Sequence, residues 1–283
     1  MARTEPTARP VDGPAAACAG LVRIYPTATG ETHALRGVDA EFDAGTVTAL
    51  MGPSGSGKST LLALLALRDR ASGGEVTVLG RPTSSLRTGD RRRLSRRTIA
   101  WVPQRSTDGV FPHLTARQNV EQAARWRGAA HEAGDALLRR LGLQEVEGVL
   151  AARLSGGEQQ RLAVACACIG TPTLLLCDEP TAELDEETAA LVLRELRGAA
   201  DAGAAVVVAT HDPDAVAASD RVVALRHGVV STERRVGSDA HASIDPTGRV
   251  QLPPEALLLF PDRRAVLRVD DGRVVLEPTP EGS

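Results

Sequence analysis

The sequence predicts an α/β protein with a mostly parallel β-sheet, a helical insertion and a small β-rich unit near its C-terminal end. Three observations carry this prediction. Short apolar runs typical of strands alternate with helical segments, a glycine-rich loop joins one such strand directly to a helix, and the composition changes near residue 238. Strands that alternate with helices favour a parallel sheet, and a late run of short alternating segments favours a separate unit.

The first part of the chain contains four strand candidates and one helix candidate. The third strand is apolar and ends at Gly52, where the glycine-rich loop begins, and the helix after that loop is also apolar. The strand candidates are residues 21–25, 38–42, 45–51 and 75–79, and the helix candidate is 59–67.

The middle of the chain, from about residue 87 to 161, is rich in helix-forming residues and is expected to be a helical subdomain inserted between strands. After it, residues 173–177 form a short continuous apolar run, as expected for a strand buried on both faces. A helix over 186–197 and a second buried strand over 204–209 follow. This part of the chain therefore continues the alternating α/β pattern.

The pattern divides the chain into a tail, a body and a small appended unit. Residues 1–19 are rich in Pro, Ala and Thr without the apolar segment of a signal peptide, so we expect a disordered tail. Residues 20–237 form the body and 238–243 a linker. Residues 244–283 form the β-rich unit, with strand candidates at 249–252, 265–269 and 273–277, a hairpin turn at Asp271-Gly272 and a short helix from Pro253-Pro254-Glu255 to Phe260.

Composition excludes several classes of protein. The formal charge of 33 − 36 = −3 and an aromatic content of 2% give no reason to expect a non-specific nucleic-acid binder. The longest apolar runs have seven or eight residues, against roughly 20 for a membrane-spanning helix. The four cysteines form neither a disulfide framework nor a metal-ligand spacing, so we interpret them as small core residues in a reducing compartment.

The loop after Gly52 matches the phosphate-binding pattern G-x-x-x-x-G-K-[ST] throughout. Glycines let the backbone wrap closely around phosphates, and the inward-pointing amides are backed by the positive end of the following helix. Lys58 is placed to span the β- and γ-phosphates and Ser59 to ligate Mg²⁺. The sequence therefore predicts a nucleotide site made by Gly52, Pro53, Ser54, Gly55, Ser56, Gly57, Lys58, Ser59 and Thr60.

Two carboxylates, Asp178 and Glu179, follow the buried strand 173–177. They lie at the carboxyl end of the strand, where open α/β sheets bind ligands. An acidic pair at this place is also common near helix N-termini, but a phosphate-binding loop 178 − 58 = 120 residues upstream favours catalysis. We expect Asp178 to hold the Mg²⁺ shell and Glu179 to activate or orient the attacking water.

The run Leu154-Ser155-Gly156-Gly157-Glu158-Gln159-Gln160-Arg161 resembles the LSGGQ signature of ABC ATPases, with Glu158 in place of the commonest Gln. Locally, Ser155 can cap a helix with Glu158 at capping-box spacing. The resemblance covers about residues 20–236 and implies a P-loop ABC ATPase core that binds ATP and Mg²⁺. It also implies that Ser155, Gly156, Gly157 and Glu158 face the γ-phosphate held by a partner subunit.

Four further positions agree with this resemblance. Gln104 matches the loop that senses Mg²⁺ and contacts the membrane subunit, and Asp185 matches the D-loop, although Glu183 departs from the small residue often found there. His211 follows a buried strand and matches the histidine that contacts the γ-phosphate. Tyr25, the only tyrosine, matches the aromatic that stacks on adenine, with an ordinary core aromatic as the competing interpretation.

The implied function is the ATP-binding and ATP-hydrolysing subunit of an ABC transporter. Two copies, or this chain and a second ATPase, would stack head to tail around two ATP, with catalysis by Lys58, Glu179 and His211. Mg²⁺ would be held by Ser59, Gln104 and Asp178. With no membrane span of its own, the chain would need a separate permease and lie in the cytoplasm, peripheral on the inner face of the cell membrane.

The branch of the family is indicated by residues 34–38 and 111–120, which are most similar to ATPases of lipoprotein release and macrolide export. That similarity implies an exporter. Three alternatives stay open: a cell-division-type ABC ATPase that signals through a membrane partner, a soluble ABC ATPase acting on DNA or ribosomes, and a regulator whose tail binds DNA.

The β-rich unit, residues 244–283, is similar to the AbrB-type swapped-hairpin domain. The similarity lies in residues 244–253 and in the hairpin that ends at 273–278. Such domains form interlaced dimers and often bind DNA. From Asp245 to Ser283 the charge is 5 − 7 = −2, which disfavours the clustered cations that phosphate binding needs. The β-rich unit is therefore expected to be a dimerisation module that does not bind DNA, with a generic β-rich cap on the ATPase as the alternative.

Overall fold

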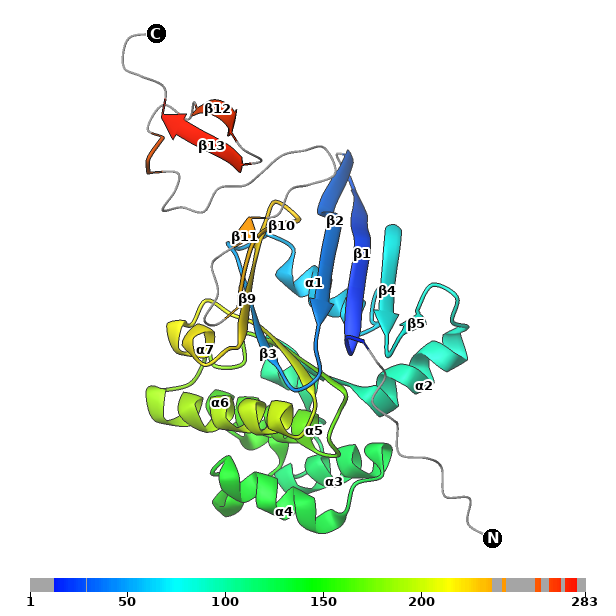
Figure 1. Cartoon of the computed structure of the whole chain (residues 1–283). Helices are drawn as coiled ribbons and strands as arrows, with labels where there is room; N and C mark the ends of the chain where they lie inside the picture. The colour runs from blue at the N-terminus through cyan, green and yellow to red at the C-terminus, as the bar shows by residue number, and fades with distance from the viewer. Residues whose placement is uncertain are drawn as a thin grey trace.

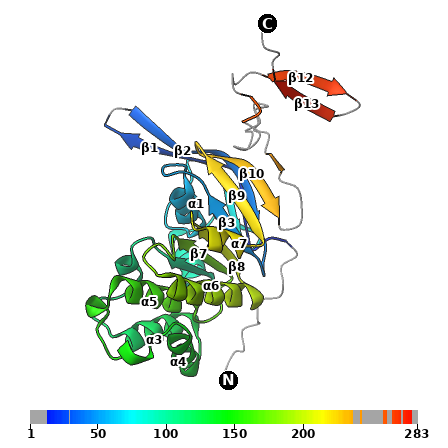
Figure 2. The same ribbon diagram turned by 90° about the vertical axis from the view of Figure 1, so that its left-hand side faces the viewer.

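The computed structural model describes residues 13–28, 30–235, 241–242, 258–260, 265–270 and 273–278. Its larger sheet has seven strands in the order β11-β10-β9-β3-β8-β7-β6. The five strands from β9 to β6 pair in parallel, and β10 and β11 join one edge antiparallel, which confirms the expected mostly parallel sheet (Figures 1 and 2). These strands are β11 (His241–Ala242), β10 (Val229–Arg235), β9 (Arg221–Arg226), β3 (Val47–Met51), β8 (Ala205–Ala209), β7 (Leu174–Asp178) and β6 (Ile99–Val102).

A second sheet is antiparallel, with the order β2-β1-β4-β5. It contains β1 (Ala16–Thr27), β2 (Gly30–Phe42), β4 (Gly73–Val78) and β5 (Arg81–Pro82). The first two strands are longer than the sequence indicates. Residues 16–19, which were expected in the disordered tail, belong to β1 because Ala16 and Cys18 are buried in the core between the sheets.

Seven helices lie among the described residues: α1 (Lys58–Leu65), α2 (Thr88–Thr98), α3 (Ala116–Arg127), α4 (His131–Arg140), α5 (Gly156–Cys168), α6 (Glu186–Asp201) and α7 (Pro213–Ala217). Figure 1 shows α3 and α4 at the end of the molecule away from β1, β2 and β4. The expected helical stretch 87–161 differs from the structure in two ways. It is interrupted by β6, whose pairing with β7 makes it the edge of the large sheet, and α5 continues past it to Cys168.

The buried strands of the large sheet contact a different core on each face. Leu175 and Cys177 belong to the core shared with α3, α4, α5 and α6, whereas Leu174 and Leu176 belong to the core shared with α1 and the small sheet. All five residues of β7 are buried, which explains the uninterrupted apolar run in the sequence. Packing on both faces fixes the carboxyl ends of β3, β7 and β8, where the candidate site lies.

The C-terminal unit is described in part. β12 (Ala265–Asp270) and β13 (Arg273–Pro278) pair antiparallel, at the places where two strands were expected. His241 and Ala242, expected in a linker, form the short strand β11 because they pair with β10. The expected strand 249–252, the turn at Asp271-Gly272 and most of the helix up to Phe260 lie outside the described residues.

Within the residues that the structure describes, no helix is both long enough and apolar enough to cross a lipid bilayer.

Candidate nucleotide site

A pocket of about 690 Å³ opens where β3, β7 and β8 end. Open α/β sheets bind ligands at this edge. Most of the expected residues line it together, and three from β2 join them. The lining residues are Tyr25, Thr32, His33, Ala34, Gly52, Pro53, Ser54, Gly55, Ser56, Gly57, Lys58, Ser59, Thr60, Gln104, Asp178, Glu179 and His211.

The loop between β3 and α1 requires glycine at two places. Gly52 has a φ of +146°, and a Cβ there would lie 2.2 Å from the carbonyl oxygen of Leu225. Gly57 has a φ of +107°, and its Cβ would lie 2.6 Å from the carbonyl oxygen of Ala34. Any side chain would push the loop away from its neighbours, so these glycines let it follow a tight path around a ligand.

The start of α1 suits an anion. Its N-cap is Gly57, so no side chain caps the first amides, and no acidic residue lies in the first turn. Uncapped amides carry the positive end of the helix dipole, and a phosphate satisfies both the hydrogen bonds and the charge. This geometry agrees with the phosphate-binding pattern of the sequence.

Two polar groups in the loop point to a ligand. Lys58 Nζ donates hydrogen bonds to the carbonyl oxygens of Gly52 (2.7 Å) and Pro53 (3.2 Å), which holds its ammonium group in the loop. Ser56 is 2% exposed, and its Oγ has no hydrogen-bond partner among the described residues. An unpaired buried hydroxyl costs about 1–3 kcal/mol, a cost that a bound polar ligand would remove.

The oxygen donors next to the loop suit a hard divalent cation. Asp178 at the end of β7 is buried, and the Ser59 side chain shares a hydrogen bond with it. Burial raises the pKa of Asp178, partly offset by that hydrogen bond, and a nearby cation would favour its ionised form. Gln104 lines the same pocket. Carboxylate, hydroxyl and amide oxygens, together with phosphates, are the ligands that Mg²⁺ prefers, so these residues fit the ion.

Glu179 and His211 form a pair over the pocket. Glu179 has a φ of +50°, a strained conformation for a non-glycine residue, and its backbone N–H donates to Ala209 O at 2.8 Å. His211 Nδ1 lies 3.0 Å from Glu179 Oε1, and the His211 side chain is 80% exposed while that of Glu179 is 13% exposed. The hydrogen bond to Glu179 and its negative charge raise the pKa of His211 above its ordinary value.

Tyr25 is not an ordinary core aromatic. It is half-buried, lines the nucleotide pocket from β1 and donates a hydrogen bond from its hydroxyl to Asp69 Oδ2 at 2.8 Å. Its ring is therefore available at the side of the pocket, as stacking on a base requires.

The remaining expected residues lie outside this pocket. Ser155 caps α5 in a capping box: its Oγ accepts from Glu158 N at 3.3 Å, and its own N–H donates to Glu158 Oε2 at 2.8 Å. The carboxylate of Glu183 packs against Gly156 at this helix start. Asp185 caps α6, where its Oδ1 accepts from Thr188 N at 2.9 Å. The chain thus brings the expected residues together in two groups, and a single copy does not join them.

Sequence reasoning missed three lining residues, Thr32, His33 and Ala34. They lie in the part of β2 before the expected strand, and Thr32 pairs with Tyr25 in the ladder between β1 and β2. The one signal that could have identified them is a hairpin in which the strand of Tyr25 pairs with the residues just after it, because that pairing brings residues 32–34 to the side of Tyr25.

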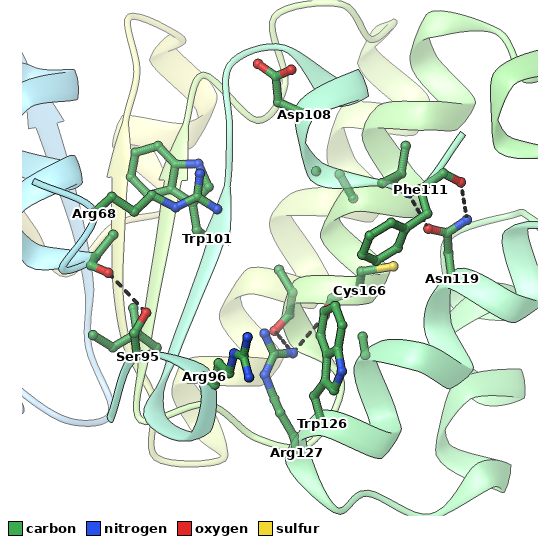
Figure 3. Close-up of a pocket in the computed structure, with 17 residues that line it drawn as sticks. Arg68, Ser95, Arg96, Trp101, Asp108, Phe111, Asn119, Trp126, Arg127 and Cys166 are labelled. Atoms are coloured by element: carbon green, nitrogen blue, oxygen red, sulfur yellow. Dashed lines mark hydrogen bonds between the residues drawn. The ribbon is translucent and has the colours of Figure 1, made fainter. Parts of the chain in front are cut away.

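A second hollow, of about 290 Å³, lies between α2, β6, α3 and α5 (Figure 3). Figure 3 shows arginines, Trp101, Trp126 and Phe111 around it. Trp126 is 53% exposed, and its ring meets the Phe111 ring edge-on at 5.7 Å. Trp101 lies on β6, three residues before Gln104, so one short strand connects this hollow to the nucleotide pocket.

A family model described as "ABC transporter" matches residues 35–182 of the chain. Among curated proteins, the chain is 42% identical to the lipoprotein-releasing system ATP-binding protein LolD of Anaeromyxobacter dehalogenans, over 82% of this chain and 100% of that protein. It is 38% identical to the macrolide export ATP-binding/permease protein MacB 1/2 of Paracoccus denitrificans, over 78% of this chain but only 33% of that protein.

The fold is also similar to solved structures. A dimeric bacterial ABC transporter cassette superposes with a TM-score of 0.74 at 29% identity, over 79% of this chain and 100% of that one. An ATP-binding cassette in a dimeric post-hydrolysis state with ADP and phosphate superposes with a TM-score of 0.73 at 28% identity, with the same coverage.

Proposed function

The chain is an ATP-binding and ATP-hydrolysing subunit of the ABC transporter family, and on that premise we propose that two copies close head to tail around two ATP. The observation that carries this proposal is the division of the expected site residues into two groups. Lys58, Glu179 and His211 line one pocket, whereas Ser155 lies at the start of α5, outside it. A second copy that presents its α5 would complete each pocket.

In this proposal the triphosphate lies along the loop from Gly52 to Thr60. Lys58 balances the β- and γ-phosphate charge, and the uncapped start of α1 supplies amide donors. Asp178, Ser59 and Gln104 would hold Mg²⁺, which when bound neutralises charge on the phosphates. Tyr25 would stack on the base, because it stands at the side of the same pocket.

Glu179 would orient the attacking water and accept its proton. Its strained backbone fixes the carboxylate beside the pocket, and His211 is held 3.0 Å away on the same carboxylate. His211 is largely exposed, so it can turn toward a γ-phosphate when ATP is bound. Catalysis would then come from positioning of the water and from charge stabilisation of the phosphates.

The second half of each site would come from the other copy. Residues 155–158 stand at the start of α5. Glu183, two residues before Asp185, packs against Gly156 at this helix start. ATP would therefore join the two copies, and hydrolysis would remove the γ-phosphate that bridges them. Binding and hydrolysis then switch the dimer between closed and open states.

The partner would be an ABC permease that docks in the hollow of Figure 3. Exposed aromatic and arginine side chains around this hollow suit an amphipathic protein segment. Trp101 of β6 lines the hollow, and Gln104, two residues after β6, lines the nucleotide pocket. A displacement of Trp101 by the permease can therefore be transmitted to Gln104. The relatives named for lipoprotein release and macrolide export support an exporter. Docked on its permease, the chain would be peripheral on the inner face of the cell membrane.

The test of the shared site is crosslinking between the phosphate loop of one copy and the start of α5 of another. A crosslink that needs ATP supports the proposal, and its absence in every nucleotide state contradicts it.

We further propose that residues 244–283 are an AbrB-like dimerisation module. The hairpin of β12 and β13 supports this, because Leu267 opposes Leu276 and Val269 opposes Val274, which puts apolar residues on one face. Leu267 is 62% and Val269 72% exposed. A hairpin of two strands is marginally stable in water, so an apolar face of this kind needs a covering surface.

Deleting residues 239–283 should weaken self-association without ATP, because the apolar hairpin face would be lost. Sedimentation velocity over a range of protein concentrations would measure this. The matched control is Arg268→Gln, which breaks the 3.3 Å ion pair with Glu277 without removing an apolar residue and should leave association unchanged. Unchanged sedimentation after the deletion would remove the proposed role of the tail.

A further inference from the structure

Two charged side chains hold Tyr25 from outside the nucleotide pocket. The Tyr25 hydroxyl donates a hydrogen bond to Asp69 Oδ2 at 2.8 Å, and Arg23 Nε donates to the same oxygen at 2.9 Å. The guanidinium carbon of Arg23 lies 4.2 Å from the centre of the Tyr25 ring. The ring is therefore tied at its hydroxyl and covered by a cation on one face.

The Asp69 carboxylate is itself held in place. It lies shortly after α1, the helix that begins at the phosphate loop, and its backbone N–H donates to Ala63 O at 3.3 Å. Its Oδ1 accepts from Arg70 N at 2.7 Å, which leaves Oδ2 for Arg23 and Tyr25. Asp69 thus links the position of the Tyr25 ring to α1, the helix that follows the phosphate loop.

Asp69 remains charged at neutral pH. Burial alone would raise its pKa, but hydrogen bonds from Tyr25 and Arg70 and the positive charge of Arg23 bring the pKa below its ordinary value. Because the carboxylate stays ionised, it accepts both hydrogen bonds at once and keeps Arg23 against the ring.

The strand that carries Tyr25 is also hydrogen-bonded to the segment after α1 that contains Asp69. Ser72 N donates to Val22 O at 2.8 Å, and Ile24 N donates to Ser72 Oγ at 3.0 Å. Tyr25 lines the nucleotide pocket, whereas neither Arg23 nor Asp69 is among its lining residues. A flat ligand in the pocket can therefore use only the ring face that Arg23 does not cover.

We infer that Arg23 and Asp69 are positioning residues, which fix the Tyr25 ring so that a purine base stacks on its free face. This inference rests on the proposed function, because it takes the pocket to hold a nucleotide. A ring that is already fixed loses little freedom when the base arrives, so binding is stronger. A purine covers more of the ring than a pyrimidine does, so the device favours ATP over UTP.

The test measures KM and kcat of the full chain with ATP and with UTP. Arg23→Leu and Asp69→Asn should each raise KM for ATP about three- to tenfold, the range expected for loss of one cation–π contact or charged hydrogen bond. The kcat for ATP should stay within about twofold, because the residues do not touch the phosphates, and KM for UTP should hardly move. The preference for ATP over UTP therefore falls.

Two controls separate positioning from a general loss of structure. Arg81→Leu removes an exposed arginine of the same sheet that does not line the pocket, and it should leave both KM values unchanged. Arg23→Leu added to Tyr25→Ala should raise KM for ATP no further, since the ring it positions is absent. The inference is wrong if Arg23→Leu behaves like Arg81→Leu, raises KM equally for ATP and UTP, or adds its full effect in the Tyr25→Ala background.

The single tyrosine of the chain gives a direct measurement. After incorporation of 3-fluorotyrosine, the ¹⁹F spectrum of the parent chain should show one Tyr25 signal that moves on addition of ATP. Asp69→Asn should broaden or split that signal without ATP, because the hydroxyl loses its anchor. An unchanged spectrum would overturn the inference. This spectrum and equilibrium ATP binding do not require turnover, so they decide the inference even if the proposed hydrolytic roles of Lys58 and Glu179 fail.

Discussion

Glu179→Gln should reduce kcat for ATP hydrolysis by about 10²–10⁴-fold, the usual contribution of a general base. Glutamine keeps the size of the side chain and can still hydrogen-bond His211 Nδ1, which lies 3.0 Å from Glu179 Oε1, but it cannot take a proton from water. ATP binding should stay within about threefold of the parent, because the change leaves the phosphate loop intact. Dimers closed around unhydrolysed ATP should therefore accumulate.

Steady-state phosphate release would measure the loss of kcat. Size-exclusion chromatography with light scattering, run in the presence of ATP, would measure the accumulation of dimers. Glu183→Gln makes the same chemical change four residues away, outside the pocket lining, and should hydrolyse ATP far faster than Glu179→Gln. If Glu179→Gln hydrolyses ATP at the parental rate, another group is the catalytic carboxylate.

Lys58→Ala should weaken ATP binding by about 10- to 100-fold, the range for loss of a hydrogen bond to a charged group. Lys58 Nζ is held at the Gly52 and Pro53 carbonyls, where it would meet the β- and γ-phosphates. Since AMP has neither phosphate, its affinity should hardly change. Calorimetric titration with both nucleotides would check this difference.

The control for Lys58→Ala is Arg105→Ala, which removes an exposed cation next to Gln104 that does not line the pocket. It should bind ATP like the parent. Equal loss of ATP and AMP affinity in Lys58→Ala would mean that the loop had collapsed, and unchanged ATP affinity would mean that Lys58 does not contact the phosphates.

The sequence was sufficient for the parts of the fold where local pattern and tertiary packing agree. The run at 173–177 is apolar because β7 is buried on both faces, and the glycines at 52 and 57 stand where a Cβ would collide with Leu225 and Ala34. Most of the nucleotide pocket follows from these two segments, because the carboxyl ends of parallel strands meet at one edge of the sheet.

The sequence was insufficient where long-range contacts decide the structure. β6 has only four residues and becomes a strand by pairing with β7. β9 alternates buried and half-buried residues and includes Arg221, whose buried guanidinium forms a 2.7 Å ion pair with Glu233. The support of Tyr25 by Asp69 joins residues 44 positions apart, which no local pattern reports. The lining residues of β2 reach the pocket because β2 pairs with β1.

In the proposed dimer, one ATP is held by the phosphate loop of one copy and by the start of α5 of the other. Crosslinking between two copies tests this shared site. Two variants in the Glu179→Gln background each carry one added thiol, Ser54→Cys in the loop and Arg153→Cys just before α5, both at exposed positions. Cys18 and Cys177 are buried and Cys166 and Cys168 half-buried, and burial raises all four thiol pKa values, so the native cysteines should react slowly.

The two variants are mixed, given ATP and Mg²⁺, and treated with a short thiol crosslinker. Covalent dimers joining Ser54→Cys to Arg153→Cys should form with ATP and should be scarce without nucleotide. Dimers that form equally without ATP, or that join only two copies of the same variant, would contradict the shared site.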